Sequence, residues 1–208
     1  MKLTWLGHSC FLITSGNSSL LIDPFEPGSV PGYSKISQTV DGVLCTHQHF
    51  DHNYTPGAVI KEQPDLSPFH ITEIPSYHDD RQGTLRGSNT IYLIEAEGIR
   101  LAHMGDIGCP LTQEQLNLLK NLKACLIPVG GTYTVNAEGA KQILDALSPE
   151  IVLPMHYRDG EYGLQDLECS LEDFTVLFHN RSFIYYRTNE MELTMDTPAH
   201  IAVLHQPA

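Results

Sequence analysis

The sequence has little positive charge and no long hydrophobic run. Lysine and arginine together number 12, against 25 aspartate and glutamate residues, so the formal net charge of the 208-residue chain is −13. A protein that follows a phosphate backbone needs a basic surface, which this composition does not supply, and we therefore expect no nucleic-acid partner. No stretch of about 18 apolar residues is present, which argues against a membrane helix.

Cysteines are few and scattered. The five thiols form no CxxC pair, and their number is odd, so neither a disulfide framework nor a cysteine-rich zinc site is expected. The apolar run near the amino terminus is interrupted by Gly7, His8 and Ser9, which is unfavourable for a signal peptide. We expect a cytoplasmic protein with reduced thiols.

The chain also lacks linkers, charge blocks and low-complexity tracts. Its length suits a single domain over residues 1–208 with a sizeable core. Because nothing in the sequence suggests a separate lid or recognition domain, we expect a small-molecule substrate. The sequence leaves open whether the chain forms a homo-oligomer.

Secondary structure is predicted from hydrophobic periodicity and from turn residues. The first half contains short strand-like runs, at residues 3–5, 10–14, 19–22, 42–45, 69–73, 90–95 and 100–103. The second half alternates helices with strands. Residues 111–122 and 136–149 have helical spacing, with Thr112 and Asn136 as caps. The strands predicted there comprise residues 124–129, 150–156, 176–180 and 182–188. This order indicates mixed sheets flanked by helices, of the α/β class.

The segment CTHQHFDHNY contains the densest group of ionisable side chains. His47, His49, Asp51 and His52 lie within six residues, directly after an apolar run. Neutral imidazoles and carboxylates are good ligands for zinc. His47 and His49 can face one way from extended backbone, and Asp51 and His52 follow where the chain turns. Four ligands in so short a segment could serve two metal ions about 3.5–4 Å apart.

One segment cannot complete the coordination of two ions. Further candidates are His78, Asp106 and His156, each of which follows a strand-like stretch or opens a turn. Asp106 could bridge the two cations. Asp79, the neighbour of His78, is an alternative at that position.

These motifs resemble the metallo-β-lactamase superfamily. The resemblance rests on HxHxDH, LLIDP, HMGDIG and LPMHY, and it spans the chain. TWLGHSCFLI and PVGGTYT are most similar to the small branch that includes ascorbate-phosphate lactonase-like and N-acylphosphatidylethanolamine phospholipase D-like proteins. The resemblance implies a four-layer αβ/βα sandwich of two mixed β-sheets flanked by helices.

The resemblance also implies roles for individual residues. His47, His49 and His78 would bind the first metal; Asp51, His52 and His156 would bind the second; and Asp106 would bridge them. Asp23 would hold a ligand imidazole from behind. Asp51, Asp106 and His8 are the candidates for catalysis, whereas roles for His103, Tyr133, Arg81 and Arg86 stay open.

Metal-dependent hydrolysis is the predicted chemistry. Two divalent ions, zinc first and manganese or iron next, would activate a water towards a small ester, lactone, amide or phosphodiester. One alternative is an iron-dependent oxidoreductase that uses the same ligands for persulfide or oxygen chemistry. Another is a structural metal site, which the open coordination positions and the distant cysteines make unfavourable.

Overall fold

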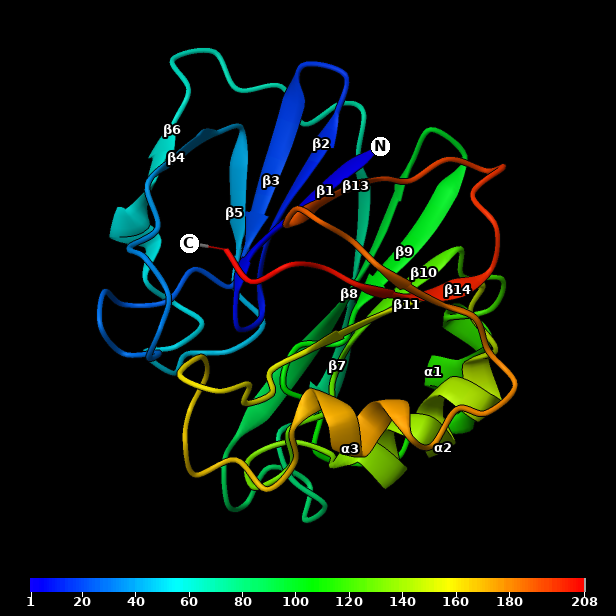
Figure 1. The fold of residues 1–208 in the computed structure, drawn as a ribbon. Helices are drawn as coiled ribbons and strands as arrows, with labels where there is room; N and C mark the ends of the chain where they lie inside the picture. The colour runs from blue at the N-terminus through cyan, green and yellow to red at the C-terminus, as the bar shows by residue number, and fades with distance from the viewer. Residues whose placement is uncertain (208) are drawn as a thin grey trace.

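Two β-sheets pack face to face and form the centre of the protein. The computed structural model describes residues 1–207 (Figure 1). The first sheet has five strands in the order β13-β1-β2-β3-β5. They are β1 (Lys2–Gly7), β2 (Cys10–Ser15), β3 (Ser18–Ile22), β5 (Gly42–Leu44) and β13 (Glu190–Glu192).

The second sheet has seven strands in the order β12-β14-β11-β10-β9-β8-β7. They are β7 (His70–Tyr77), β8 (Ser88–Ala96), β9 (Ile99–His103), β10 (Ala124–Pro128), β11 (Ile151–Met155), β12 (Phe183–Tyr185) and β14 (His200–Val203). Every residue of β10 and β11 is buried, as expected of central parallel strands that are covered on both faces.

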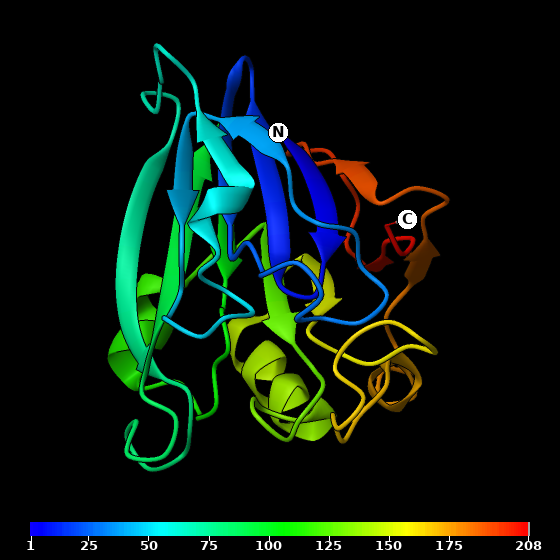
Figure 2. The same ribbon diagram turned by 90° about the vertical axis from the view of Figure 1, so that its left-hand side faces the viewer.

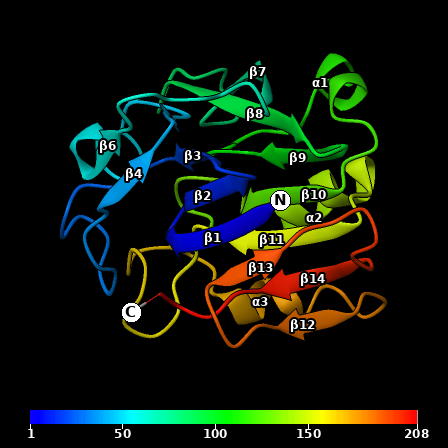
Figure 3. The same cartoon turned by 90° about the horizontal axis from the view of Figure 1, so that it is seen from above.

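The layers outside the two sheets differ. The α-helices lie beyond the seven-stranded sheet, as the view from above shows (Figure 3). They are α1 (Gln113–Leu118), α2 (Ala137–Leu147) and α3 (Leu171–Thr175). Beyond the five-stranded sheet lie a two-stranded pair and a short 3₁₀ helix (Figure 2). These are β4 (Gln38–Val40), β6 (Ala58–Ile60) and η1 (Thr55–Gly57).

The predicted caps explain where the first two helices begin. The side chain of Thr112 accepts a hydrogen bond from the Gln115 N–H, and Gln115 completes a capping box. Asn136 caps α2 in the same way through the Gly139 N–H. Helix α1 is shorter than predicted, because the chain turns after Leu118 and buries Leu119 and Leu122 from that turn.

The strand predicted over residues 176–180 is wrong. This stretch is the turn that follows α3, which begins with a capping box between Ser170 and Asp173. Phe174 and Phe178 lie four residues apart, and their ring centroids are 4.8 Å apart, so a helical spacing buries both rings on one side. The apolar letters of this run therefore belong to a helix end and not to an alternating strand.

Strand directions decide where the functional side chains gather. In the second sheet β9, β10 and β11 are parallel, and β7 runs in the same direction because two antiparallel steps separate it from β9. In the first sheet β1, β3 and β5 share one direction by the same argument. The carboxyl ends of these strands therefore meet at one edge of each sheet.

Two further sequence expectations can be compared with the structure. None of the helices in residues 1–207 has the length and apolarity that crossing a bilayer requires. All five cysteines are free thiols, and three of them are buried.

Candidate metal centre

The carboxyl ends of six strands supply the residues that the sequence analysis singled out. His8 follows β1, Asp23 follows β3, and residues 47–52 follow β5. His78 follows β7, Asp106 follows β9 and His156 follows β11. The structure thus brings all of the predicted ligands, together with His8 and Asp23, to one place between the two sheets.

Asp106 lies at the centre of this group. Its Oδ2 atom lies within 4 Å of the Nε2 atoms of four histidines. The distances are 3.1 Å to His156, 3.2 Å to His52, 3.3 Å to His78 and 3.9 Å to His47. The carboxylate therefore reaches imidazoles from both halves of the predicted ligand set.

His49 and Asp51 complete the cluster on its open side. The ring centroid of His49 lies 4.7 Å from that of His47 and 5.0 Å from that of His78. His49 is exposed, whereas the other predicted ligands are buried. Asp51 Oδ2 lies 3.4 Å from His8 Nε2 and 3.8 Å from His52 Nε2. Donor atoms of His47, His49 and His78 lie within 4.8 Å of one another, as do those of His8, Asp51, His52 and His156.

Three of the imidazoles have a hydrogen-bond partner at Nδ1, which fixes the orientation of the ring. His52 Nδ1 lies 2.8 Å from Asp23 Oδ2, and His78 Nδ1 lies 3.0 Å from the Tyr133 carbonyl oxygen. A carboxylate and a carbonyl accept only, so Nδ1 carries the proton in both rings. His47 Nδ1 lies 3.0 Å from the Thr46 hydroxyl, which donates to Asp23 at 2.7 Å and so accepts from His47. In all three rings Nε2 is then left to bind a metal.

Several buried polar atoms of the cluster have no hydrogen-bond partner among the described residues. They are Nε2 of His8, His47, His52 and His156, Nδ1 of His8 and His156, and Oδ1 of Asp106. An unsatisfied buried polar atom costs about 1–3 kcal/mol, so this many in one place are unfavourable without a ligand. Imidazole nitrogens with carboxylate oxygens form the donor set that suits zinc and related divalent ions.

The electrostatics of the cluster are those of neutral and anionic ligands. Burial lowers the pKa of His47 to about 3, and burial together with the nearby His156 lowers the pKa of His8 to about 4. Burial alone would raise the pKa of Asp106, but His156 and His52 outweigh it and hold that pKa well below its ordinary value. His52 and His78 differ: burial opposes the charged form of both rings, but Asp106 raises the pKa of each, and Asp23 also raises that of His52.

The backbone of three cluster residues adopts an uncommon conformation. His8, Asp23 and His156 have φ values of 52°, 49° and 53°, in the left-handed region that side-chain-bearing residues seldom occupy. Each stands directly after a strand, where this conformation turns the side chain towards the sheet edge. Such conformations cost free energy and are concentrated at functional sites.

Two residues that shape the centre were not predicted from the sequence. Thr46 connects Asp23 to His47 through its hydroxyl and also donates its N–H to Asp23 at 2.7 Å. Asn89 is buried in β8, and its Oδ1 accepts the Asp106 N–H at 2.9 Å. The one indication of this role in the sequence is that Asn89 is a polar residue at the start of an apolar strand.

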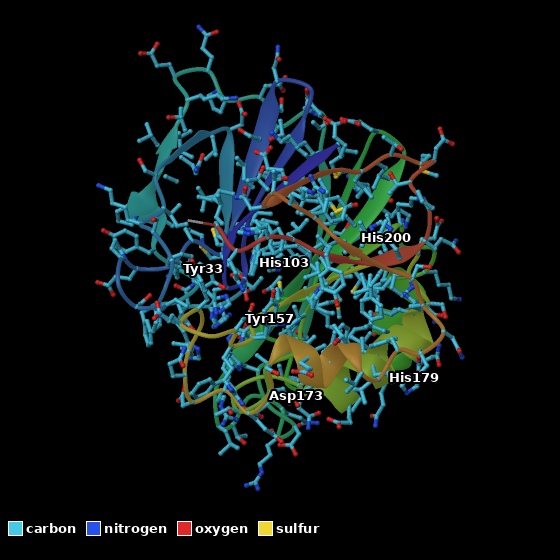
Figure 4. All side chains as sticks on the ribbon, viewed as in Figure 1. Tyr33, His103, Tyr157, Asp173, His179 and His200 are labelled. Carbon is cyan, nitrogen blue, oxygen red and sulfur yellow. The ribbon has the colours of Figure 1, made fainter. Side chains whose placement is uncertain are left out.

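The remaining candidates lie outside the cluster. His103 is buried and donates from Nε2 to the Ser9 carbonyl at 2.9 Å, so it ties the two sheets together. Asp79 accepts backbone hydrogen bonds instead of joining the imidazoles, which leaves His78 as the residue in the centre. Figure 4 labels His179 and His200, and neither belongs to a group of potential metal ligands in residues 1–207.

Comparison with known proteins agrees with this architecture. Residues 2–156, about three quarters of the chain, match the family described as the beta-lactamase superfamily domain. The chain belongs to the beta-lactamase superfamily. A solved structure of a candidate zinc-dependent hydrolase of this superfamily, from Thermotoga maritima, has a TM-score of 0.73 and 28% sequence identity, and the match covers 98% of this chain and 97% of that one. The predicted family and fold are confirmed.

Curated relatives of this superfamily member include archaeal proteins. A UPF0173 metal-dependent hydrolase of Methanoregula boonei is 30% identical over an alignment of 194 residues, and the match covers 77% of this chain and 84% of that protein. A protein of the same description from Archaeoglobus fulgidus is 28% identical over an alignment of 193 residues, and the match covers 76% of this chain and 83% of the relative.

Proposed function

We propose that the cluster binds two divalent metal ions and hydrolyses a small ester or lactone. The coarser part, that the chain is a metal-dependent hydrolase, follows from its family and from the names of its relatives. The observation that carries the finer part is the position of Asp106 Oδ2, within 4 Å of the Nε2 atoms of four histidines. A carboxylate so placed can be shared by two ions.

The ligands divide into two groups on either side of Asp106. His47, His49 and His78 would hold one ion, and their donor atoms lie close enough together to do so. Asp51, His52 and His156 would hold the other. Seven side chains leave coordination positions open on two ions, which is the arrangement of catalytic sites and not of closed structural ones.

Each group of residues would have a defined task in catalysis. Bound there, two divalent ions would lower the pKa of a shared water so that hydroxide forms near neutral pH. Asp51 and Asp106 line the adjoining cavity, so their carboxylates are placed to orient that water and accept its proton. Asp23, Thr46 and the Tyr133 carbonyl keep three ligand imidazoles in one tautomer.

His8 is better suited to positioning than to contact with substrate. It does not line the adjoining cavity, and its side chain is fully buried. Its Nε2 atom lies 3.4 Å from Asp51 Oδ2, and its ring centroid lies 4.0 Å from that of His156. We therefore assign His8 to holding Asp51 and His156 in place, in preference to the catalytic role suggested by the sequence.

Metal analysis together with an activity panel tests the proposal. Protein purified without added metal should contain two ions per chain, and anomalous scattering from crystals should place both beside Asp106. Zinc or manganese protein should hydrolyse esters or lactones, and chelation should abolish the activity. A single ion per chain, or no turnover with any metal, would contradict it. A coloured iron protein that consumes oxygen or a persulfide would favour the oxidoreductase alternative.

A further inference from the structure

A cavity of about 490 Å³ opens beside the cluster, and its walls differ in character. The cluster side is made by His49, Asp51, His78 and Asp106. The remaining wall consists of Phe50, Leu85, Arg86, Tyr133, Leu164 and Asp166. This volume is within the range of small-molecule sites, and apolar walls with a few polar groups are their usual composition.

The loop that carries Leu85 and Arg86 is locked by one carboxylate. Asp79, which follows the candidate ligand His78, is buried and accepts four backbone hydrogen bonds from N–H groups within residues 81–86. The bonds from the Leu85 and Arg86 N–H groups measure 3.0 and 2.8 Å. The backbone of both wall residues is therefore fixed relative to the metal centre.

Arg86 presents an uncompensated positive charge to the cavity. One of its N–H groups donates to the Thr132 carbonyl at 2.9 Å, and its guanidinium lies 5.7 Å from the centroid of the Tyr133 ring. Among residues 1–207 the one arginine in an ion pair is Arg100. Arg86 thus keeps most of its donors available, in a chain whose net charge is −13 and which has abundant carboxylates to offer.

Two apolar side chains stand at the same cavity and are largely exposed. Phe50 is 59% exposed and Leu85 is 58% exposed, although both could be buried by a ligand. The carboxylate of Asp166 lines the same cavity and accepts a hydrogen bond from the Tyr133 hydroxyl, and among the described residues it forms no ion pair with Arg86. The cavity therefore combines an apolar surface with one fixed guanidinium beside the proposed ions.

We propose that the substrate is a small ester or lactone whose acyl chain is apolar and carries a carboxylate, which Arg86 binds while Phe50 and Leu85 cover the chain. This inference rests on the proposed hydrolase function of the cluster. A guanidinium offers paired N–H donors that match the two oxygens of a carboxylate, and Phe50 and Leu85 supply apolar surface for the chain that carries it. In the reaction the water oxygen bonds to the acyl carbon, the acyl–oxygen bond breaks, and a proton from the water passes to the freed oxygen, which leaves as the alcohol or phenol of an ester or stays on the same chain when a lactone opens.

A matched pair of esters tests the inference. Mono-p-nitrophenyl glutarate and p-nitrophenyl valerate have the same chain and the same scissile bond, and they differ in the terminal carboxylate. The metal-loaded wild-type protein should prefer the glutarate. Arg86→Gln should reduce kcat/KM for the glutarate by about 10- to 100-fold, the value of a hydrogen bond to a charged group, and should leave the valerate unchanged. Arg81→Gln is the control, because the exposed Arg81 does not line the cavity.

Binding supplies a second measurement that does not depend on turnover. Calorimetry with glutaramate and valeramide, amides that hydrolyse far more slowly, should show tighter binding of the anion and loss of that preference in Arg86→Gln. An unchanged preference in Arg86→Gln, in either measurement, would overturn the inference. Absence of ester hydrolysis together with Arg86-dependent binding of glutaramate would instead count against the hydrolase and support the anion site.

Discussion

The five buried histidines of the centre fall into two sets that differ in how they are held. The anchored imidazoles, His47, His52 and His78, each have a partner at Nδ1. The unanchored imidazoles, His8 and His156, are fully buried and have no hydrogen-bond partner at either nitrogen among the described residues. The first set is oriented by the fold before any ion binds, whereas the second depends on an ion or on close neighbours for its orientation.

This difference shows which imidazoles of the centre the polypeptide orients without a bound ion. A hydrogen bond at Nδ1 selects the tautomer and points Nε2 inwards, so the anchored set offers three ready ligands. Burial of the unanchored rings without hydrogen-bond partners costs free energy, and only a new partner such as a metal ion can offset that cost. We therefore expect loss of the unanchored ligand His156 to change how many ions bind, and mutations behind the anchored side to change how tightly they bind.

The largest effect is expected for His156→Ala, compared with His8→Ala. Removal of the His156 ring deletes a proposed ligand, so the metal content should fall from two ions to one per chain. His8→Ala removes a neighbour and should retain both ions at saturating metal. Elemental analysis after desalting measures both. Two ions in His156→Ala would remove it from the ligand set, and one ion in His8→Ala would make His8 a ligand.

A smaller effect is expected for Asp23→Asn. An amide cannot accept hydrogen bonds from His52 and from both donors of Thr46 as the carboxylate does. Metal affinity should fall by about 10- to 100-fold, the usual loss for such outer partners. Competition with a chromophoric chelator measures this. Asp41→Asn is the control, since that buried carboxylate binds Lys61 and Ser19 far from the imidazoles and should leave the affinity unchanged.

The smallest effect is expected for Thr46→Val. The substitution keeps the shape of the side chain but removes the hydroxyl that lies between His47 and Asp23. One hydrogen bond is worth about 0.5–1.5 kcal/mol, so metal affinity should weaken by about two- to tenfold. Thr46→Ser retains the hydroxyl and should bind like the wild type in the same competition assay. If valine and serine behave alike, the Thr46 hydroxyl does not orient His47.

The metal ligands could be predicted because they follow local sequence patterns. One segment directly after a strand contains His47, His49, Asp51 and His52. The strands around this segment are short and regularly spaced. The helix capped by Thr112 could be predicted equally well, because a capping box is a local arrangement. The strand prediction for residues 176–180 was wrong, since apolar residues in this order fit a helix end as well as a strand. Only the packing of Phe178 against Phe174 distinguishes the two structures.

The roles of Thr46, Asn89 and Arg86 could not be read in the same way. Asn89 meets the Asp106 N–H from a neighbouring strand, and Arg86 reaches the Thr132 carbonyl across 46 positions of the chain. Contacts of this kind depend on sheet pairing and on the path of long loops. Similarly, only the structure shows that His78 lies beside Asp106 while the Asp79 carboxylate accepts backbone N–H groups of the following loop.

The sequence by itself determined the chemistry available to this protein: a cluster of imidazoles and carboxylates placed after strands, in an acidic chain with free thiols. Only the tertiary structure decided that parallel strand ends from two sheets bring Asp106 within 4 Å of four imidazoles, and that Arg86 and Leu85 share one cavity with them. The physical reason is that ligand type is a property of each side chain, whereas convergence depends on strand direction and sheet packing, which distant residues determine together.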